Sequence, residues 1–222
     1  SYTNKPFIQN FNLYIPAGKS IAIVGKSGSG KTTIVNLLNK FYEVNSGEIL
    51  IDNTNINNIY NLRKSIGIVL QDSKIFEGTI KENISYGNPN ATIDEIIEAS
   101  KLASAHQFIT NLPYKYDTYI SNNSGLSEGE IQLINIARIM LQKPPILIFD
   151  EATSNIDLLT ENLIQNATKK LTKHSTSIII AHRLSTIKSC DLIVFLENGK
   201  IVEMGTHNEL LNKKGYYYNM YN

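Results

Sequence analysis

Short runs of apolar residues, each bounded by glycine, proline or polar positions, mark the strands of this chain. Runs of four or five residues are long enough for a buried strand and too short for a helix of several turns. The pattern predicts strands at Phe11–Ile15, Ser20–Val24, Glu48–Ile51, Ile66–Leu70, Ile146–Phe149, Ser177–Ala181 and Leu192–Leu196. A Pro16-Ala17-Gly18-Lys19 turn separates the first two strands, and Ser46-Gly47 forms a turn before the third.

Apolar positions spaced three and four residues apart predict helices elsewhere. This spacing runs from Ile34 to Phe41 and recurs at Ile93–Ala105, Glu128–Leu141 and Leu158–Leu171. From about Asp72 to Met140 the predicted elements are mostly helical, whereas strands dominate before and after this stretch. The order of elements therefore predicts an α/β core interrupted by a helical insert, with no internal repeat.

A glycine-rich segment connects the predicted strand Ser20–Val24 to the helix that follows. It reads Gly25-Lys26-Ser27-Gly28-Ser29-Gly30-Lys31-Thr32, which satisfies the pattern G-x-x-x-x-G-K-[ST]. Glycines let successive N–H groups face phosphate oxygens, and the N-terminus of the helix directs positive charge to the same anion. Lys31 is expected to bridge the β- and γ-phosphates, and the Thr32 hydroxyl to bind Mg²⁺. The motif predicts a nucleoside triphosphate but not what is done with it.

Two acidic residues, Asp150 and Glu151, follow the predicted strand Ile146–Phe149. Ligands of open α/β sheets bind at the carboxyl ends of strands, so these side chains are expected beside the nucleotide. Asp150 is the candidate Mg²⁺ ligand and Glu151 the candidate base that polarises the attacking water. An acidic pair that caps the next helix is the alternative. His182 follows the strand Ser177–Ala181 and is expected to contact the γ-phosphate from the same edge.

The amino-acid composition limits the kinds of partner that the chain can bind and the cellular compartment that it fits. The 222 residues, 42% of them apolar, are enough to bury the core of one large domain. Twenty-one basic and 20 acidic residues give a net charge of +1, so nothing indicates a nucleic-acid-binding surface. The single Cys190 excludes an internal disulfide and fits a reducing compartment. No apolar run approaches the roughly 18 residues that span a bilayer, and no signal peptide is recognisable.

In this order, the motifs resemble the ATPase domains of ABC transporters over essentially the whole chain. Gly25–Thr32 matches the Walker A loop, and Asp150-Glu151 matches the end of the Walker B strand with its catalytic glutamate. Gln71 matches the Q-loop glutamine, Ser154-Asn155-Ile156-Asp157 the D-loop, and His182 the switch histidine. The resemblance implies an α/β fold with a RecA-like P-loop ATPase core, an antiparallel β subdomain and a helical subdomain.

The resemblance also implies domain bounds and a set of site residues. One ABC ATPase domain would cover residues 1–222, with its core at about 1–71 and 141–222 and its helical subdomain at about 72–140. The implied catalytic residues are Glu151, His182 and Gln71, and the implied Mg²⁺ ligands are Thr32, Gln71 and Asp150. The implied contacts to ATP are Tyr2, Gly25, Ser27, Gly28, Ser29, Gly30, Lys31, Thr32, Thr33, Ser127 and Gly129. Tyr2 matches an aromatic that stacks on adenine; a terminal core anchor is the alternative.

The family signature, usually Leu-Ser-Gly-Gly-Gln, is Leu126-Ser127-Glu128-Gly129-Glu130 in this chain and departs at two of five positions. In the family the signature contacts the nucleotide held by the opposite subunit, so that two ATPase domains enclose each ATP. Ser127 and Gly129 remain available for the γ-phosphate, whereas Glu128 and Glu130 add negative charge near an anion unless they turn outward. We therefore expect a weakened site for the partner, and a second ATPase domain that is either identical or different.

Further segments narrow the resemblance to exporters. They are Val69–Asp72, Ile75–Ile80 and Ala181–Thr186. Gln132-Leu133 and Glu151–Asp157 resemble bacterial multidrug exporters that work as heterodimers, and peptide and bacteriocin exporters carry similar segments.

The exporter resemblance implies a transmembrane domain as partner, fused or separate, and a position on the cytoplasmic face of a membrane, the bacterial plasma membrane. Because the chain opens at Ser1, this domain is expected upstream. The stretch Lys74–Glu77 is expected to face it, and a solvated loop is the alternative for that stretch.

One rival interpretation is a domain that binds ATP to gate a partner and barely hydrolyses it; the altered signature favours this, whereas Glu151 and His182 argue against it. A soluble ABC-type ATPase without a transport role is the other rival interpretation. Such proteins carry long coiled coils or duplicated cassettes, which this sequence lacks, and the neutral charge argues against nucleic acid.

Overall fold

The computed structural model describes residues 7–70, 74–121, 125–150, 156–173, 175–181 and 183–221. Its internal contacts divide the chain into two compact units, and each is described by itself. The first unit comprises Ser1–Ile66, Ile148–Glu151 and Thr176–Asn222, and the second comprises Gly67–Leu147 and Ala152–Ser175. The core and helical bounds expected from the sequence, near residues 72 and 140, stay a prediction.

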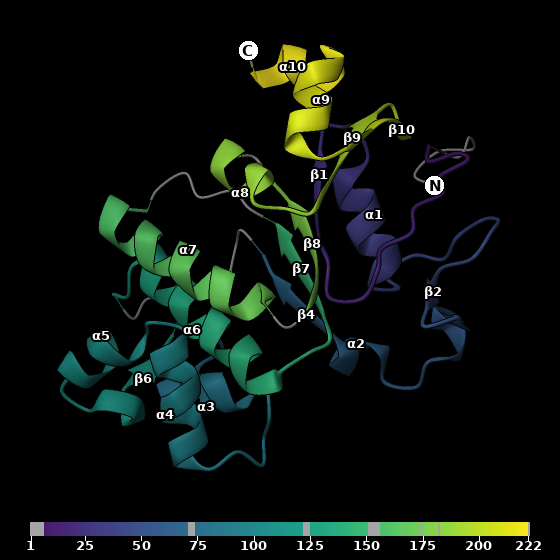
Figure 1. Cartoon of the computed structure of the whole chain (residues 1–222). Helices are drawn as coiled ribbons and strands as arrows, with labels where there is room; N and C mark the ends of the chain where they lie inside the picture. The colour runs from purple at the N-terminus through teal and green to yellow at the C-terminus, as the bar shows by residue number, and fades with distance from the viewer. Residues whose placement is uncertain are drawn as a thin grey trace. The chain divides into compact units, whose positions relative to one another are not determined.

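Six strands form the main sheet, in the order β10-β9-β1-β8-β7-β4 (Figure 1). Their bounds are β1 Ser20–Val24, β4 Ile66–Val69, β7 Ile146–Asp150, β8 Thr176–Ile180, β9 Leu192–Glu197 and β10 Lys200–Gly205. Strand β1 pairs in parallel with both β8 and β9, and β10 returns antiparallel along β9. Ile21 to Val24 are fully buried, as expected for a strand inside a parallel sheet that is covered on both faces.

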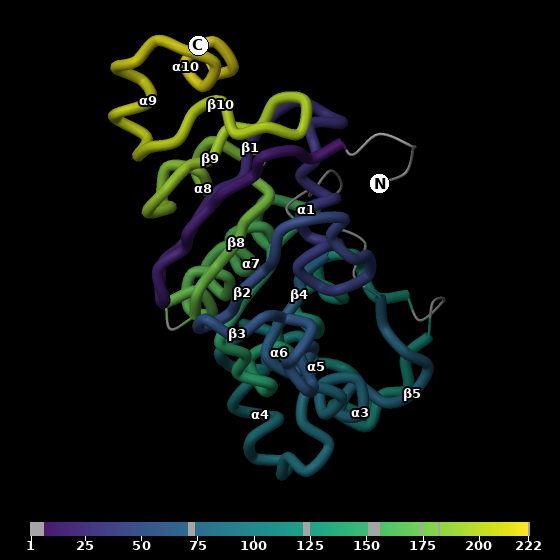
Figure 2. Tube along the Cα trace, turned by 90° about the vertical axis from the view of Figure 1, so that its right-hand side faces the viewer, coloured from purple at the N-terminus to yellow at the C-terminus, as the bar shows by residue number. Residues whose placement is uncertain are grey.

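Strand β4 from Gly67 onward and the first two residues of β7 belong to the second unit, and the other strands of the sheet belong to the first. The further elements of the first unit are short. They are α1 Lys31–Leu38, β2 Leu50–Ile51, β3 Thr54–Asn55, the 3₁₀ helix η1 Ile56–Asn58, α2 Leu62–Ser65, α8 Leu184–Lys188, α9 His207–Lys213 and α10 Tyr216–Tyr221. Strands β2 and β3 form a separate antiparallel pair. Helices α9 and α10 lie together beyond β10 (Figure 2). Glu203 on β10 accepts hydrogen bonds from the backbone N–H groups of Tyr216 and Tyr217, which fixes the start of α10.

The second unit is mainly helical. It contains β5 Gly78–Thr79, α3 Ile80–Ser85, α4 Ile93–Leu102, α5 His106–Asn111, the 3₁₀ helix η2 Lys115–Asp117, β6 Tyr119–Ile120, α6 Glu128–Gln142 and α7 Leu158–Thr172. Helix α6 contacts α3, α4 and α7, and ten of its 15 residues are buried. Capping boxes begin α3, α4 and α6, because Thr79, Thr92 and Ser127 each exchange hydrogen bonds with a glutamate three residues later.

One strand expected from the sequence is wrong. Phe11–Ile15 forms no strand, although its side chains do alternate in exposure and Tyr14 is 82% exposed. Alternation alone cannot make a strand, because a strand also needs a neighbouring backbone to complete its hydrogen-bond ladder. Within the described ranges, none of the helices combines the length and the apolar character needed to cross a membrane.

Candidate nucleotide site

The loop between β1 and α1 has a backbone that only glycine can provide. Gly25, Gly28 and Gly30 all have positive φ angles, of 148°, 76° and 111°. A Cβ atom at Gly25 would lie 2.2 Å from the carbonyl oxygen of Leu196, so no side chain fits there. Gly30 is the N-cap of α1, which brings the loop directly to the positive end of that helix.

Lys31, the first residue of α1, turns back into the loop. Its ammonium group donates hydrogen bonds to the carbonyl oxygens of Gly25, at 2.8 Å, and Lys26, at 3.0 Å. The residue is 7% exposed. Burial lowers the pKa of Lys31, and the nearby charge of Asp150 opposes this effect. Lys31 therefore places a positive charge at the centre of the glycine-rich loop.

Ser29 brings a buried hydroxyl into the same loop. The residue is 3% exposed, and among the described residues its Oγ atom has no hydrogen-bond partner. Its backbone is held on both sides: the N–H donates to the carbonyl oxygen of Lys26 at 3.2 Å, and the carbonyl accepts from the N–H of Gly199 at 3.0 Å. A buried unpaired hydroxyl is costly, so a polar ligand in this loop would remove that cost. Anionic oxygens fit this requirement.

Two oxygen-bearing side chains suit a Mg²⁺ ion. Thr32 is exposed in the first turn of α1, and Asp150 is the last residue of β7. The influence of Asp150 on the pKa of Lys31 indicates that the two charged groups are near each other. A hydroxyl and a carboxylate are the hard oxygen ligands that Mg²⁺ prefers. The predicted pair of Mg²⁺ ligands is therefore chemically suitable and lies at the loop.

The other residues expected around the loop divide into two groups. Ser27 and Gly28 are exposed and Thr33 is partly exposed, so a ligand from solution can reach them. Four residues with expected roles lie outside the described residues, namely Tyr2, Gln71, Glu151 and His182. Their roles in base stacking, Mg²⁺ binding, water activation and γ-phosphate contact stay predictions.

Helix α6 of the second unit begins at the signature segment. Ser127 is its N-cap, and the hydroxyl of Ser127 accepts a hydrogen bond from the N–H of Glu130. The carboxylate of Glu130 in turn accepts hydrogen bonds from the N–H of Ser127, at 2.9 Å, and from its hydroxyl, at 3.0 Å. Glu130 is thus turned back onto the helix start, and Glu128 is exposed. The S-x-x-E spacing could have predicted this capping box.

Gly129 has a packing role that the sequence did not reveal. It is buried in the first turn of α6, and a Cβ atom there would lie 2.3 Å from the methyl group of Thr160 on α7. The methyl group of Ile156 would be 3.3 Å away. Only glycine permits this close approach of α7 to the start of α6. The expected contacts of Ser127 and Gly129 with a partner's ATP stay predictions.

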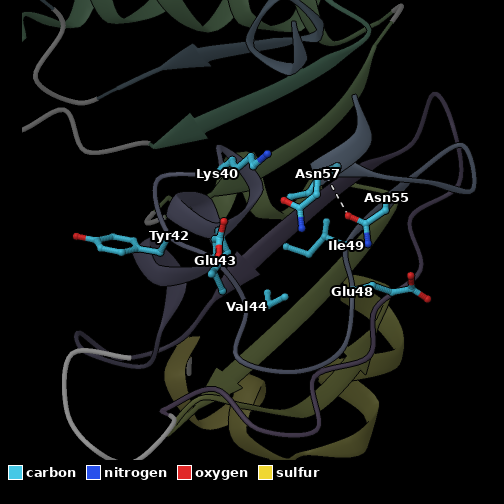
Figure 3. Close-up of a pocket in the computed structure, with 10 residues that line it drawn as sticks. Lys40, Tyr42, Glu43, Val44, Glu48, Ile49, Asn55 and Asn57 are labelled. Atoms are coloured by element: carbon cyan, nitrogen blue, oxygen red, sulfur yellow. Dashed lines mark hydrogen bonds between the residues drawn. The ribbon is translucent and has the colours of Figure 1, made fainter. Parts of the chain in front are cut away.

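A small hollow in the first unit is a poor alternative site. It lies between the end of α1 and the segment that carries β2 and β3, and Glu43, Ile49, Asn55 and Asn57 are among its lining residues (Figure 3). The N–H of Asn57 donates to the side-chain oxygen of Asn55 at 2.9 Å. The hollow has a volume of about 10 Å³, close to the minimum for one water molecule. It cannot accommodate a nucleotide.

Known proteins share these features of sequence and fold. The sequence model of the ABC transporter family matches residues 8–154. The ABC transporter ATP-binding protein YfiC of Bacillus subtilis is 52% identical over 217 residues, which are 96% of this chain and 36% of that protein. A Staphylococcus aureus protein named for multidrug export, as an ATP-binding/permease protein, is 51% identical over 97% of this chain and 38% of its own length.

A solved structure extends the comparison to three dimensions. It is described as a bacterial Atm1-family ABC exporter with ATP bound, and it is 42% identical to this chain with a TM-score of 0.91. The similarity covers 100% of this chain and 39% of the exporter chain. This chain therefore spans less than two fifths of the length of these relatives.

Proposed function

Because this chain belongs to the ABC transporter family, whose ATP-binding domains hydrolyse ATP, we propose that it is the ATP-hydrolysing domain of a membrane exporter. The observation that carries this proposal is the β1–α1 loop, with a buried Lys31 at its centre and the unpaired Ser29 hydroxyl beside it. The names of the relatives, a multidrug export ATP-binding/permease protein and an Atm1-family exporter with ATP bound, support export.

In this proposal, catalysis depends mainly on positioning and on offsetting charge. Lys31 and the N–H groups of the loop bind the phosphates. Thr32 and Asp150 hold Mg²⁺, which offsets further phosphate charge when it is bound. Glu151 polarises the attacking water, and His182 contacts the γ-phosphate. Gln71 would hold Mg²⁺ together with Thr32 and Asp150. Tyr2 stacks on adenine and contributes to binding rather than to the chemical step.

A second ATPase domain completes each site in this proposal. Ser127 and Gly129 contact the ATP of the partner domain from the N-terminus of α6, where the helix is positive. Glu128 is exposed there and Glu130 lies in the capping box, so two carboxylates lie within the first turn. Their negative charge opposes the approach of ATP. A partner of different sequence, with a less acidic signature, would leave the site of this chain's own Lys31 and Glu151 intact.

A transmembrane domain is the proposed second partner. The relatives named as ATP-binding/permease proteins are more than twice as long as this chain, which supports a fused arrangement. The ATPase domain would lie on the cytoplasmic face of the bacterial plasma membrane, where ATP is available. The stretch Lys74–Glu77 would face the transmembrane domain and transmit the closure of the ATPase pair.

Phosphate release from MgATP, measured over a range of protein concentrations, tests this proposal. Hydrolysis should require Mg²⁺, and its rate per molecule should rise with protein concentration because two domains form each site. Mixing with a second ATPase domain that has an unaltered signature should raise the rate further. A rate per molecule that stays constant with dilution would contradict a site formed by two domains.

A further inference from the structure

Arg138, near the C-terminal end of α6, has a partly buried guanidinium group without a carboxylate among its described partners. Its Nε atom donates to the backbone oxygen of Asn83 at 2.7 Å, and its two terminal nitrogens donate to the side-chain oxygens of Asn135 and Asn83, at 2.7 and 3.2 Å. Burial lowers the pKa of Arg138 to about 10, with the charge of Tyr86 opposing the shift. A partly buried cation whose partners among the described residues are all neutral is an inefficient means of stabilising a fold.

Asn83 on α3 connects Arg138 to the loop before β5, because its side chain bonds to both. Its side-chain oxygen accepts the backbone N–H of Phe76 at 2.8 Å, and its side-chain nitrogen donates to the backbone oxygen of Phe76 at 2.8 Å. The same nitrogen donates to the backbone oxygen of Thr79 at 3.1 Å. The Asn83 amide thus satisfies both backbone groups of Phe76, as a neighbouring strand would. Arg138 binds the side chain and backbone of Asn83, and so fixes this loop to α6.

Two aromatic rings lie against the same guanidinium. The rings of Phe76 and Tyr86 are 4.7 Å apart, and the central carbon of the Arg138 guanidinium lies 5.0 Å from the first and 5.8 Å from the second. Both distances are within the range of cation–π attraction. The two residues are nevertheless 48% and 66% exposed. Arg138 on α6 therefore contacts a pair of aromatic rings that are themselves exposed to solvent.

The turn after Tyr86 also touches α6 directly. A Cβ atom at Gly87 would lie 2.1 Å from the backbone oxygen of Arg138, so glycine is needed at this approach. Ser127 is the N-cap of α6, and Arg138 is a partly buried residue about three turns further along the same continuous helix. A helix of this length moves as a single rod when its end is displaced.

We propose that Arg138 is a positioning residue that couples the two ends of this rod, so that displacement of the signature end of α6 moves the Phe76–Tyr86 pair. The proposal rests on the proposed function in one respect, the contact of Ser127 and Gly129 with ATP. Phe76 belongs to the stretch Lys74–Glu77, which is already proposed to transmit closure, so the new elements are the coupling residue Arg138 and the ring of Tyr86. Asn83 carries the movement to the backbone of Phe76, and the guanidinium carries it to both rings.

A single tryptophan can report this movement, because the sequence contains none. The parent for the experiment is the chain with Tyr86→Trp, and its fluorescence is followed during titration with MgATP at protein concentrations that allow pairing. Arg138→Met removes the charge and all three hydrogen bonds. Arg138→Lys keeps the charge but lacks the planar guanidinium that donates the three hydrogen bonds at once. The matched control is Arg63→Met, because the Arg63 guanidinium lies 5.7 Å from the ring of Phe41 in the first unit. Calorimetry gives the MgATP affinity separately.

The parent and Arg63→Met should change their fluorescence on MgATP binding. In Arg138→Met the affinity for MgATP should stay within about twofold, while the fluorescence change falls by about threefold or more. The fluorescence change of Arg138→Lys should lie between that of the parent and that of Arg138→Met. If Arg138→Met does not fold, the comparison of Arg138→Lys with the parent tests the coupling. A full response in Arg138→Lys and Arg138→Met, or none in the parent, overturns the coupling. MgATP binding by the parent without a fluorescence change rejects the coupling alone, whereas absence of binding rejects the proposed function.

Discussion

The ammonium group of Lys31 donates a 2.8 Å hydrogen bond to the carbonyl oxygen of Gly25, the residue with which its own loop begins. A second bond, to the carbonyl oxygen of Lys26, closes the loop around the cation. Backbone carbonyls are weaker partners for an ammonium group than phosphate oxygens, because only the phosphate bonds join opposite charges. The loop is therefore already shaped around a positive charge that can exchange these carbonyls for phosphate.

Lys31→Ala should weaken MgATP binding by roughly tenfold to a hundredfold, the scale of a lost hydrogen bond between charged groups. Lys26→Ala is the matched control, because Lys26 contributes its carbonyl oxygen and its side chain is exposed. Calorimetric titration measures both variants. An unchanged affinity in Lys31→Ala would show that this lysine only holds the loop together.

Much of the β1–α1 loop and its flanking elements could be predicted from the sequence, because the interactions that form them are local. The strand before the loop, the glycines and the start of α1 follow from apolar runs and backbone freedom, and the structure confirms β1 and α1. The failed strand at Phe11–Ile15 shows the limit of this argument, since alternation does not say which backbone lies alongside. The packing of Gly129 against Thr160 was equally hidden, because it depends on a contact between two helices.

The Arg138 cluster was missed for a related reason. An arginine within the apolar run Ile136–Leu141 is visible in the sequence, but its partners Asn83 and Asn135 carry no motif. Short side-chain amides bond to whichever backbone group the fold brings near. The capping box of Ser127 and Glu130, by contrast, depends on residues three positions apart and was open to prediction.

Gly129→Ala should destabilise the second unit by about 1–3 kcal/mol, because the new methyl group meets the Thr160 methyl group at 2.3 Å. Thr160→Ser removes that methyl group and should recover part of the loss. Denaturant unfolding of the two single variants and the double variant measures the coupling. Strictly additive effects would show that the helix contact does not constrain Gly129.

Replacing Glu128→Gly together with Glu130→Gln should raise the ATPase activity of the isolated chain. The change removes two negative charges from the start of α6, while the introduced glutamine side chain can still accept a hydrogen bond from Ser127. Stability should fall by about 1 kcal/mol, because the change also removes two charges that favour the helix N-terminus and adds a glycine to its first turn. Phosphate release is measured against protein concentration. Brisk, concentration-dependent turnover in the unmodified chain, with no gain in the variant, would falsify the proposal of an asymmetric pair.

Asp191 should make stability depend on pH in the acid range. Its hydrogen bond to Lys19 is the main cause that lowers the pKa of Asp191 from 3.8 to about 2, followed by its bond to the N–H of Ser20. Because the folded state holds this carboxyl deprotonated, its stabilisation is complete above pH 3.8 and is lost as the pH falls towards 2.

Asp191→Asn should therefore lower the free energy of unfolding at pH 7 by about 1 kcal/mol, after allowance for the exposure of the side chain. The difference from the unmodified chain should shrink as the pH is lowered from about 4 to about 2. Asp117→Asn is the control, because Asp117 pairs with Lys81 on the surface and its side chain is 68% exposed. An effect of Asp191→Asn that is the same at every pH would contradict the assignment.

Steady-state ATP hydrolysis by Glu151→Gln, with MgATP binding measured on the same preparation, tests the central claim most directly. Glutamine keeps the size of the side chain but cannot polarise the attacking water as a carboxylate does. The account predicts that turnover falls by at least about a hundredfold, the scale of general-base catalysis, while MgATP affinity stays within a fewfold of the unmodified chain. Near-normal turnover in Glu151→Gln would contradict it.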